Sequence, residues 1–310
     1  MVRRVINSSI VTMLFVSSLV VFAILTNGLA GPNYVQRRDF GTGFLQVVQR
    51  GRWWTPVTSV FLTNGGPELV FVIVCAIALV GVSERLLGSA RTLLALVVTA
   101  AFGAAVGITV QAIGALAGEL WSSRLSGFVS FDPMTAIVGV AMTATAFAER
   151  LWRRRGRVLI LSTVLVFLLY SGQPPDLYRL CGALAGLGLG YALRPSDGSP
   201  LWPRSSHHET RVLLAAVIAI TGLGPAVTLL STPRLGPLAP LGMLLGNVRP
   251  TARAALDRCI ELQSNHNCLR DINLERINGA GPVLLTLLPL VALLVAALGI
   301  LRGRRFGAWL

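Results

Sequence analysis

Long apolar runs separated by arginine-rich segments constrain this chain more than any other feature. A helix that spans a bilayer needs about 20 apolar residues, and fewer where other helices surround it. With 54% apolar and only 13% charged residues, the chain differs from soluble globular proteins, in which about a quarter of the residues are charged. We predict an all-α polytopic membrane protein with eight transmembrane helices, at residues 8–30, 67–83, 92–117, 133–149, 157–171, 177–193, 211–231 and 281–301.

Arginine alone carries the positive charge, because the sequence contains no lysine although its formal net charge is +14. A basic chain can bind nucleic acid, but these arginines cluster at the ends of apolar runs, where anionic lipid headgroups are the nearer partner. We therefore expect membrane lipids, and no nucleic acid, at these clusters. The Ala-, Gly-, Val-, Leu- and Arg-rich composition favours a bacterial plasma membrane as the location.

The distribution of arginine over the short loops predicts the orientation of the spans. Both termini are expected in the cytoplasm, together with the arginine-rich segments at residues 3–4, 85–91, 150–157, 194–211 and 302–305. The first outward loop is an exception, because it contains Arg37, Arg38, Arg50 and Arg52. Arginines in a half-embedded loop can extend their charged ends to the headgroups, so the orientation is retained.

Residues 51–91 combine an aromatic pair, a turn and an apolar run. Trp53 and Trp54 precede a Gly-Gly-Pro turn at residues 65–67, and the run that follows ends at Glu84 and Arg85. Aromatic side chains favour the membrane interface, and Gly-Pro sequences break helices. The stretch predicts an interfacial segment, a turn back into the bilayer, and a span that ends at the headgroup layer.

This stretch resembles the rhomboid family of intramembrane serine proteases. In that family a Gly-x-Trp-Trp-Arg-type segment, a Phe-Leu-His turn and a Glu-Arg-x-x-Gly segment frame the second helix. The residues that match are Gly51, Trp53, Trp54, Phe61, Leu62, Gly65, Leu69, Phe71, Glu84, Arg85 and Gly88. The resemblance implies a rhomboid-like six-helix bundle, which here corresponds to residues 1–194.

The rest of the chain adds to this bundle. Residues 195–210 are rich in Pro, Ser and Gly and predict a cytoplasmic linker. A two-helix extension at 211–310 follows, with an extracytoplasmic loop at 232–280. Within that loop the spacing of apolar residues at 251–262 predicts a short amphipathic helix.

The resemblance also implies where catalytic residues should lie, and this sequence lacks them. Met134 occupies the position of the serine nucleophile on the fourth helix, and Arg179 that of the histidine base on the sixth. Glu68 and Val72 replace the residues of the second helix that hold the oxyanion. Arginine has no lone pair with which to accept a proton, and a carboxylate would repel a developing oxyanion. We predict no catalytic residue, no cofactor and no metal.

The histidines support the same conclusion without an alignment. A shifted register could make Thr135 or Ser130 the nucleophile, but a base would still be needed beside it. The histidines of the chain are His207, His208 and His266, all outside the predicted spans.

Small residues on the sixth predicted span favour close helix packing. Gly182, Gly186 and Gly190 recur every four residues, so they share one face and let a neighbouring helix approach backbone to backbone. Rhomboids pack the fourth helix against the sixth through such a seam. Generic small-residue packing would produce the same pattern.

Charged residues near the outward ends of the spans form a second candidate site. Intramembrane charges are costly and usually mark a function or an internal pair. One hypothesis is that Arg179 pairs with Asp132 or Glu68 and so joins two helices. In the alternative, these groups and Asp176 are each solvated at the outer surface.

The four cysteines fall into two pairs. Cys75 and Cys181 are expected to be packing residues, whereas Cys259 and Cys268 share the outer loop and could form a disulfide there.

Three functions remain open. The first is a non-proteolytic rhomboid-like protein that binds transmembrane segments or lipids as a scaffold, chaperone or regulator, as inactive rhomboid homologues and derlins do. In the second, residues 284–309 resemble the membrane region of bacterial aminoacyl-phosphatidylglycerol synthases, which implies the membrane module of a lipid-modifying system. The third is an active intramembrane serine protease.

Overall fold

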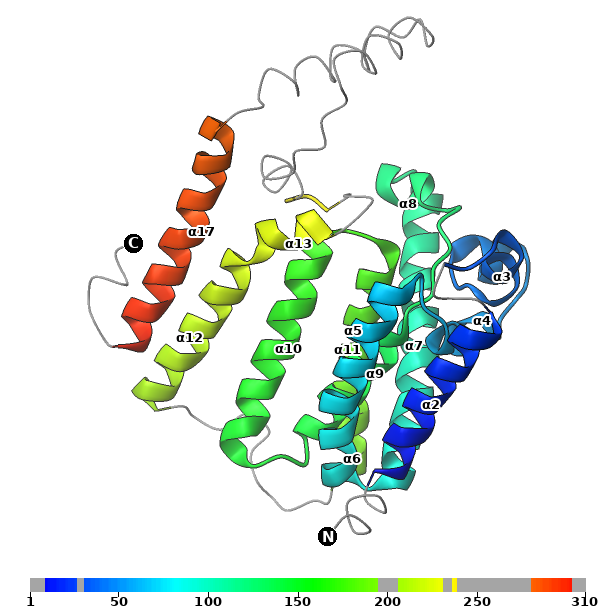
Figure 1. The fold of residues 1–310 in the computed structure, drawn as a ribbon, viewed down its shortest axis with the longest axis horizontal. Coiled ribbons are helices and arrows are strands. Elements are labelled where there is room, and N and C mark those ends of the chain that lie inside the picture. The colour runs from blue at the N-terminus through cyan, green and yellow to red at the C-terminus, as the bar shows by residue number, and fades with distance from the viewer. Residues whose placement is uncertain (1–8, 27–30, 195–205, 231–235, 239–279, 303–310) are drawn as a thin grey trace, which may run out of the picture. The chain divides into compact units, whose positions relative to one another are not determined.

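The computed structural model describes residues 9–26, 31–194, 206–230, 236–238 and 280–302 (Figure 1). The chain divides into two compact units, which are described separately. Unit 1 comprises Met1–Leu165 and Gln173–Arg204, and unit 2 comprises Val166–Gly172 and Ser205–Leu310. Regular structure in the described residues is helical, apart from one isolated antiparallel bridge between Thr42 and Ser130.

The helices are those of a membrane protein. In the described part of the chain, three helices are long and apolar enough to cross a bilayer: Gly66–Leu87, Ser89–Leu116 and His207–Val227. Shorter apolar helices are Ile10–Leu25, Pro133–Thr145 and Leu290–Leu301. A helix lies within each of the predicted runs, but the number of helices that cross the membrane and the side of each terminus stay predictions.

The second predicted span is a composite helix. α5 (Gly66–Cys75) begins at the Gly-Pro turn, continues through a π-helical segment, η3 (Ala76–Val80), and ends with α6 (Gly81–Leu87). α2 (Ile10–Leu25) packs against all three parts. α7 (Ser89–Leu116) follows after the single residue Gly88, whose φ of +81° favours glycine.

Short helices fill the segment between α2 and α5. They are α3 (Tyr34–Phe40), η1 (Leu45–Gln49), α4 (Thr55–Thr58) and η2 (Ser59–Phe61). Trp53 in this segment is 77% exposed. The carboxylate of Asp39 accepts hydrogen bonds from Arg38 and Arg52, and these bonds lower the pKa of Asp39. Two of the arginines that break the orientation rule are thus paired within this segment.

The centre of unit 1 is a three-helix core. α9 (Pro133–Thr145) packs against α7 and α11 (Pro174–Leu193), which also pack against each other. Of the 13 residues of α9, 12 are buried, so its environment is protein on nearly every side. Such a helix can be short, because its polar ends are satisfied by neighbouring chain rather than by headgroups. α8 (Leu120–Arg124) and the part of α10 (Arg150–Tyr170) up to Leu165 complete the unit. Ile160, Leu161 and Val164 of α10 pack near Met142 and Ala183.

The glycine seam lies between α9 and α11. A Cβ added at Gly182 would lie 3.1 Å from the carbonyl oxygen of Thr135, and one at Gly190 would lie 2.8 Å from that of Thr143. A Cβ at Gly186 would overlap the carbonyl oxygen of Gly139. The absence of side chains at these three positions therefore sets how closely the two helices approach.

This contact predicts opposite effects for two neighbouring substitutions. Gly186→Ala should lower the free energy of unfolding by about 1–3 kcal/mol, because a new methyl group must push α9 away. Gly188→Ala lies on the same helix, where an added Cβ meets nothing within 4 Å. It should raise the free energy by up to about 1 kcal/mol, since alanine favours a helix more than glycine does. Thermal unfolding in detergent would measure both, and equal shifts would contradict this packing.

Unit 2 contains α12 (His207–Gly222), α13 (Gly224–Leu230) and α17 (Ala280–Leu301), with α12 packed against α17 (Figure 1). α12 begins inside the predicted 195–210 linker, because the Ser206 hydroxyl accepts a hydrogen bond from the Glu209 N–H and caps the helix. Of the cysteines, Cys75 and Cys181 in unit 1 are free thiols. Cys259, Cys268 and the predicted helix at 251–262 lie outside the described residues.

Candidate functional site

Two helices of unit 1 begin beside each other with charged residues. Asp132 is the N-cap residue of α9, and Pro133 starts the helix. Pro174 and Pro175 start α11, and Asp176 and Arg179 follow in its first two turns. Proline is well suited to the first turn of a helix, because the N–H that it lacks would have no helical partner there. These three prolines thus favour helix starts immediately after Asp132 and immediately before Asp176.

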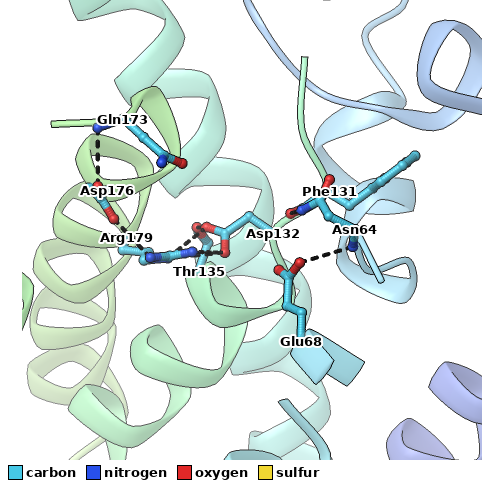
Figure 2. A network of polar contacts seen from close by, with 8 residues as sticks. All are labelled: Asn64, Glu68, Phe131, Asp132, Thr135, Gln173, Asp176 and Arg179. Carbon is cyan, nitrogen blue, oxygen red and sulfur yellow. Dashed lines mark hydrogen bonds and ion pairs between the residues drawn. The ribbon is translucent and has the colours of Figure 1, made fainter. Parts of the chain in front are cut away.

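Arg179 joins these two helix ends (Figure 2). Its Nη2 lies 2.8 Å from Asp132 Oδ1, and its Nε lies 3.0 Å from the same oxygen. Its Nη1 lies 2.8 Å from Asp176 Oδ1. The guanidinium therefore uses its planar fork to bind one carboxylate on each side, the arrangement that makes arginine the preferred residue for such pairs.

The two carboxylates are buried. The side chains of Asp132 and Asp176 are each 2% exposed, and that of Arg179 is 21% exposed. A buried charge is tolerated only where it is paired and hydrogen-bonded. The alternative in which each group is solvated separately is therefore wrong for Asp132 and Asp176.

Glu68 belongs to the same network without bonding to Arg179 directly in the described structure. Its Oε2 accepts a hydrogen bond from the Asn64 N–H at 3.0 Å. The Asn64 side chain in turn donates to the carbonyl of Phe131, next to Asp132, at 3.2 Å (Figure 2). The start of α5 is thus tied through Asn64 to the start of α9.

Residues at the positions where the resemblance expects proteolytic chemistry pack against other side chains or pair with them. Met134 is half-buried against the hydrophobic core, and Val72 is fully buried. The Thr135 hydroxyl donates to Asp132 Oδ2 at 2.5 Å. The same carboxylate also accepts hydrogen bonds from Arg179. Chemically, the arrangement can hold the starts of α9 and α11 together.

The histidines and metal-ligating residues add no site to the described part of the chain. His207 and His208 are exposed in the first turn of α12, in unit 2, and His266 lies outside the described residues. Within those residues, no group of three or more His, Cys, Asp or Glu side chains could hold a metal ion.

Glu84 has a role that the sequence analysis missed. It is 2% exposed, and its carboxylate accepts hydrogen bonds from the N–H groups of Val11 and Thr12 at 2.9 and 2.8 Å. The hydroxyls of Thr12 and Ser89 also donate to it, each at 2.7 Å. Glu84 thus caps the first turn of α2. Its backbone partners lie 72 and 73 residues away, so the residues near Glu84 in the sequence do not predict these hydrogen bonds.

Arg157 is a second residue whose role the sequence does not show. It belongs to the arginine-rich segment 150–157, where anionic headgroups are expected, but it is 2% exposed. Its Nη1 donates to the Tyr191 hydroxyl at 2.8 Å, and its Nε donates to the Thr145 hydroxyl at 3.2 Å. Its guanidinium carbon also lies 4.9 Å from the centroid of the Tyr191 ring. Arg157 therefore links α9, α10 and α11 at their other ends.

Comparison with known proteins gives one informative match. An uncharacterized protein of Corynebacterium glutamicum is 28% identical to this chain over 233 residues, which cover 74% of this chain and 29% of that protein. The chain thus spans less than a third of the length of this relative. No family model matches the chain, and no solved structure matches it.

Proposed function

We propose that this chain is a non-proteolytic rhomboid-like membrane protein that binds transmembrane segments or lipids as a scaffold, chaperone or regulator. The observation that carries the proposal is the pairing of Arg179, the residue at the family's base position, with Asp132 and Asp176. A guanidinium held between two carboxylates joins α9 and α11 and cannot activate a nucleophile.

The packing of the helices also supports the resemblance. The fourth and sixth helices of a rhomboid meet along small residues, and α9 and α11 meet along Gly182, Gly186 and Gly190. The scaffold of the family thus fits this chain even though its catalytic groups do not.

An apolar face on the second helix suits a partner within the bilayer. Val70, Phe71, Val74 and Ile77 of α5 and η3 are each 56–63% exposed, so their side chains point away from unit 1. In the family, the second and fifth helices border a lateral opening. A transmembrane segment or an acyl chain would lie against this face.

A second candidate function is the membrane module of a lipid-modifying system related to aminoacyl-phospholipid synthases. The observation that favours it is the relative from Corynebacterium glutamicum, because the match occupies 29% of that protein. Most of the relative therefore lies outside the matched region, as expected where a membrane module is joined to a further domain.

Labelling with a fluorophosphonate tests the absence of proteolytic chemistry. The purified protein should remain unlabelled, because Met134 and Arg179 replace the nucleophile and the base. A known serine hydrolase in the same detergent would serve as the positive control. Labelling of a hydroxyl in α9 that Thr135→Val abolishes would overturn the proposal in favour of an active protease.

Crosslinking and lipid analysis separate the two remaining functions. A photoreactive amino acid at Phe71, which is exposed, should capture a transmembrane segment or a lipid, whereas the same probe at Phe131, which is 1% exposed, should capture only this chain. Accumulation of aminoacylated phospholipid in cells that overproduce the protein would favour the second candidate. Capture of nothing at Phe71 would contradict the first.

A further inference from the structure

A groove of about 490 Å³ lies between α2 and the second helix of unit 1. Its walls include Thr12, Met13 and Val16 on one side and Ile77, Val82 and Arg85 on the other. Sites for small organic ligands usually have volumes of about 300–1,000 Å³. Met13, Ile77 and Val82 are about half exposed, at 47%, 58% and 56%, so the groove opens to the surroundings of the protein.

A change in helix geometry shapes one wall of this groove. Ile77 belongs to η3, the π-helical segment that interrupts the second helix. Single π-helical turns are rare and are found frequently at functional sites. Gly81, at the end of this segment, has no side chain, and an added Cβ would lie 3.8 Å from the methyl group of Thr12. The helices therefore touch at Gly81 and leave room beside this contact.

Charge is confined to one end of the groove. Glu84 bonds to Val11 and Thr12 in the first turn of α2, which places the next residue, Arg85, at that level. Arg85 is exposed and makes no hydrogen bond or ion pair with the part of the chain that the structure describes. The Glu84 carboxylate instead accepts hydrogen bonds from Val11, Thr12 and Ser89. Toward Val16 and Ile77 the walls are mainly apolar.

We propose that this groove binds one anionic glycerophospholipid, with its phosphate at Arg85 and an acyl chain along Met13, Val16 and Ile77. Residues 9–17 of α2 border the groove for about 12 Å, at 1.5 Å per residue, which suits a headgroup and the upper part of a chain. The proposal rests on the lipid-binding form of the proposed function and names the ligand and its site.

Native mass spectrometry tests this with added phosphatidylglycerol and, as a neutral comparison, phosphatidylcholine with the same acyl chains. Wild-type protein should retain phosphatidylglycerol in preference. Arg85→Ala should reduce that retention roughly fivefold, because a single arginine near a membrane surface attracts anionic lipid with an energy of about 1 kcal/mol. Arg85→Lys should keep most of it. Ala78→Trp, which fills the apolar part of the groove, should abolish it without removing a charge.

Arg150→Ala provides the matched control, because Arg150 is also exposed but does not line the groove, and it should bind lipid as the wild type does. Thermal unfolding would verify that each variant folds. If the wild type retains phosphatidylglycerol in preference and neither Arg85→Ala nor Ala78→Trp changes that retention, the groove is not the site. Lipid binding by the protein would still stand. Equal retention of the two lipids by the wild type would overturn the groove and weaken the lipid-binding form of the proposed function.

Discussion

Arg179→Ala should lower the free energy of unfolding by about 3–5 kcal/mol, because it leaves two buried carboxylates without their counter-ion. Asp132 and Asp176 are each 2% exposed, so water cannot replace the guanidinium without opening the start of α9 or α11. For a domain of this size the loss corresponds to a decrease in melting temperature of about 10 °C. Thermal unfolding in detergent, followed by circular dichroism, would measure it.

A double-mutant cycle separates the pair from the rest of the network. Asp132→Asn removes one of the two unpaired charges, so the double variant Arg179→Ala/Asp132→Asn should be less destabilised than the sum of the single variants. Arg38→Ala is the matched control, because Arg38 pairs with Asp39 on the surface, where its side chain is 44% exposed, and such pairs contribute little. An Arg179→Ala protein that melts with the wild type would contradict the role of this pair in joining α9 and α11.

Glu84→Ala should lower the free energy of unfolding by about 3 kcal/mol, since it leaves two backbone N–H groups of α2 buried without an acceptor. Besides lowering the stability of the whole protein, the substitution should loosen the first turn of α2. Amide hydrogen exchange at Val11 and Thr12 should accelerate strongly, whereas exchange in the α9–α11 core should follow only the global stability. Glu84→Gln should give an intermediate effect, because an amide oxygen can still accept some of these bonds.

Glu119 offers the matched control for Glu84. Its carboxylate accepts hydrogen bonds from the Trp121 and Ser122 N–H groups and caps α8, but it is exposed. These bonds, the one from Ser122 above all, lower the pKa of Glu119, so its small contribution is present above the pKa of the unfolded chain and is lost as the pH falls through the folded value. Glu119→Ala should leave the melting temperature nearly unchanged at neutral pH. If Glu84→Ala and Glu119→Ala lowered the melting temperature equally, burial of Glu84 would not explain its larger expected effect.

The sequence predicts the long helices of this protein well, because each contains an apolar run bounded by charges or by Gly-Pro, whereas the short helices between α2 and α5 have no such run. It also predicts the face of α11 that packs most closely, since glycines at spacing four leave few alternatives. The charged site is partly predictable: Asp132 and Arg179 each stand at the start of an apolar run, on the same predicted side. What the sequence does not show is that Asp176 shares the guanidinium and that Asn64 connects Glu68 to this site.

Glu84 and Arg157 show why the remainder could not be predicted. A charge at the end of an apolar run is ordinarily explained by headgroups, and both residues fit that pattern in the sequence. Their partners are brought close only when helices pack, as α2 does on α6 for Glu84, and as α9 and α11 do beside α10 for Arg157. Burial of a charge is a property of the assembled bundle, and a single sequence does not contain it.

The one-residue connection at Gly88 bears on how the chain assembles. Because only Gly88 separates them, α6 and α7 form a helical hairpin, and the Ser89 hydroxyl donates a hydrogen bond to Glu84 across its turn. α2 precedes this hairpin in the chain, but the carboxylate that receives its N–H groups belongs to α6. α2 therefore completes this contact only after α6 has been made.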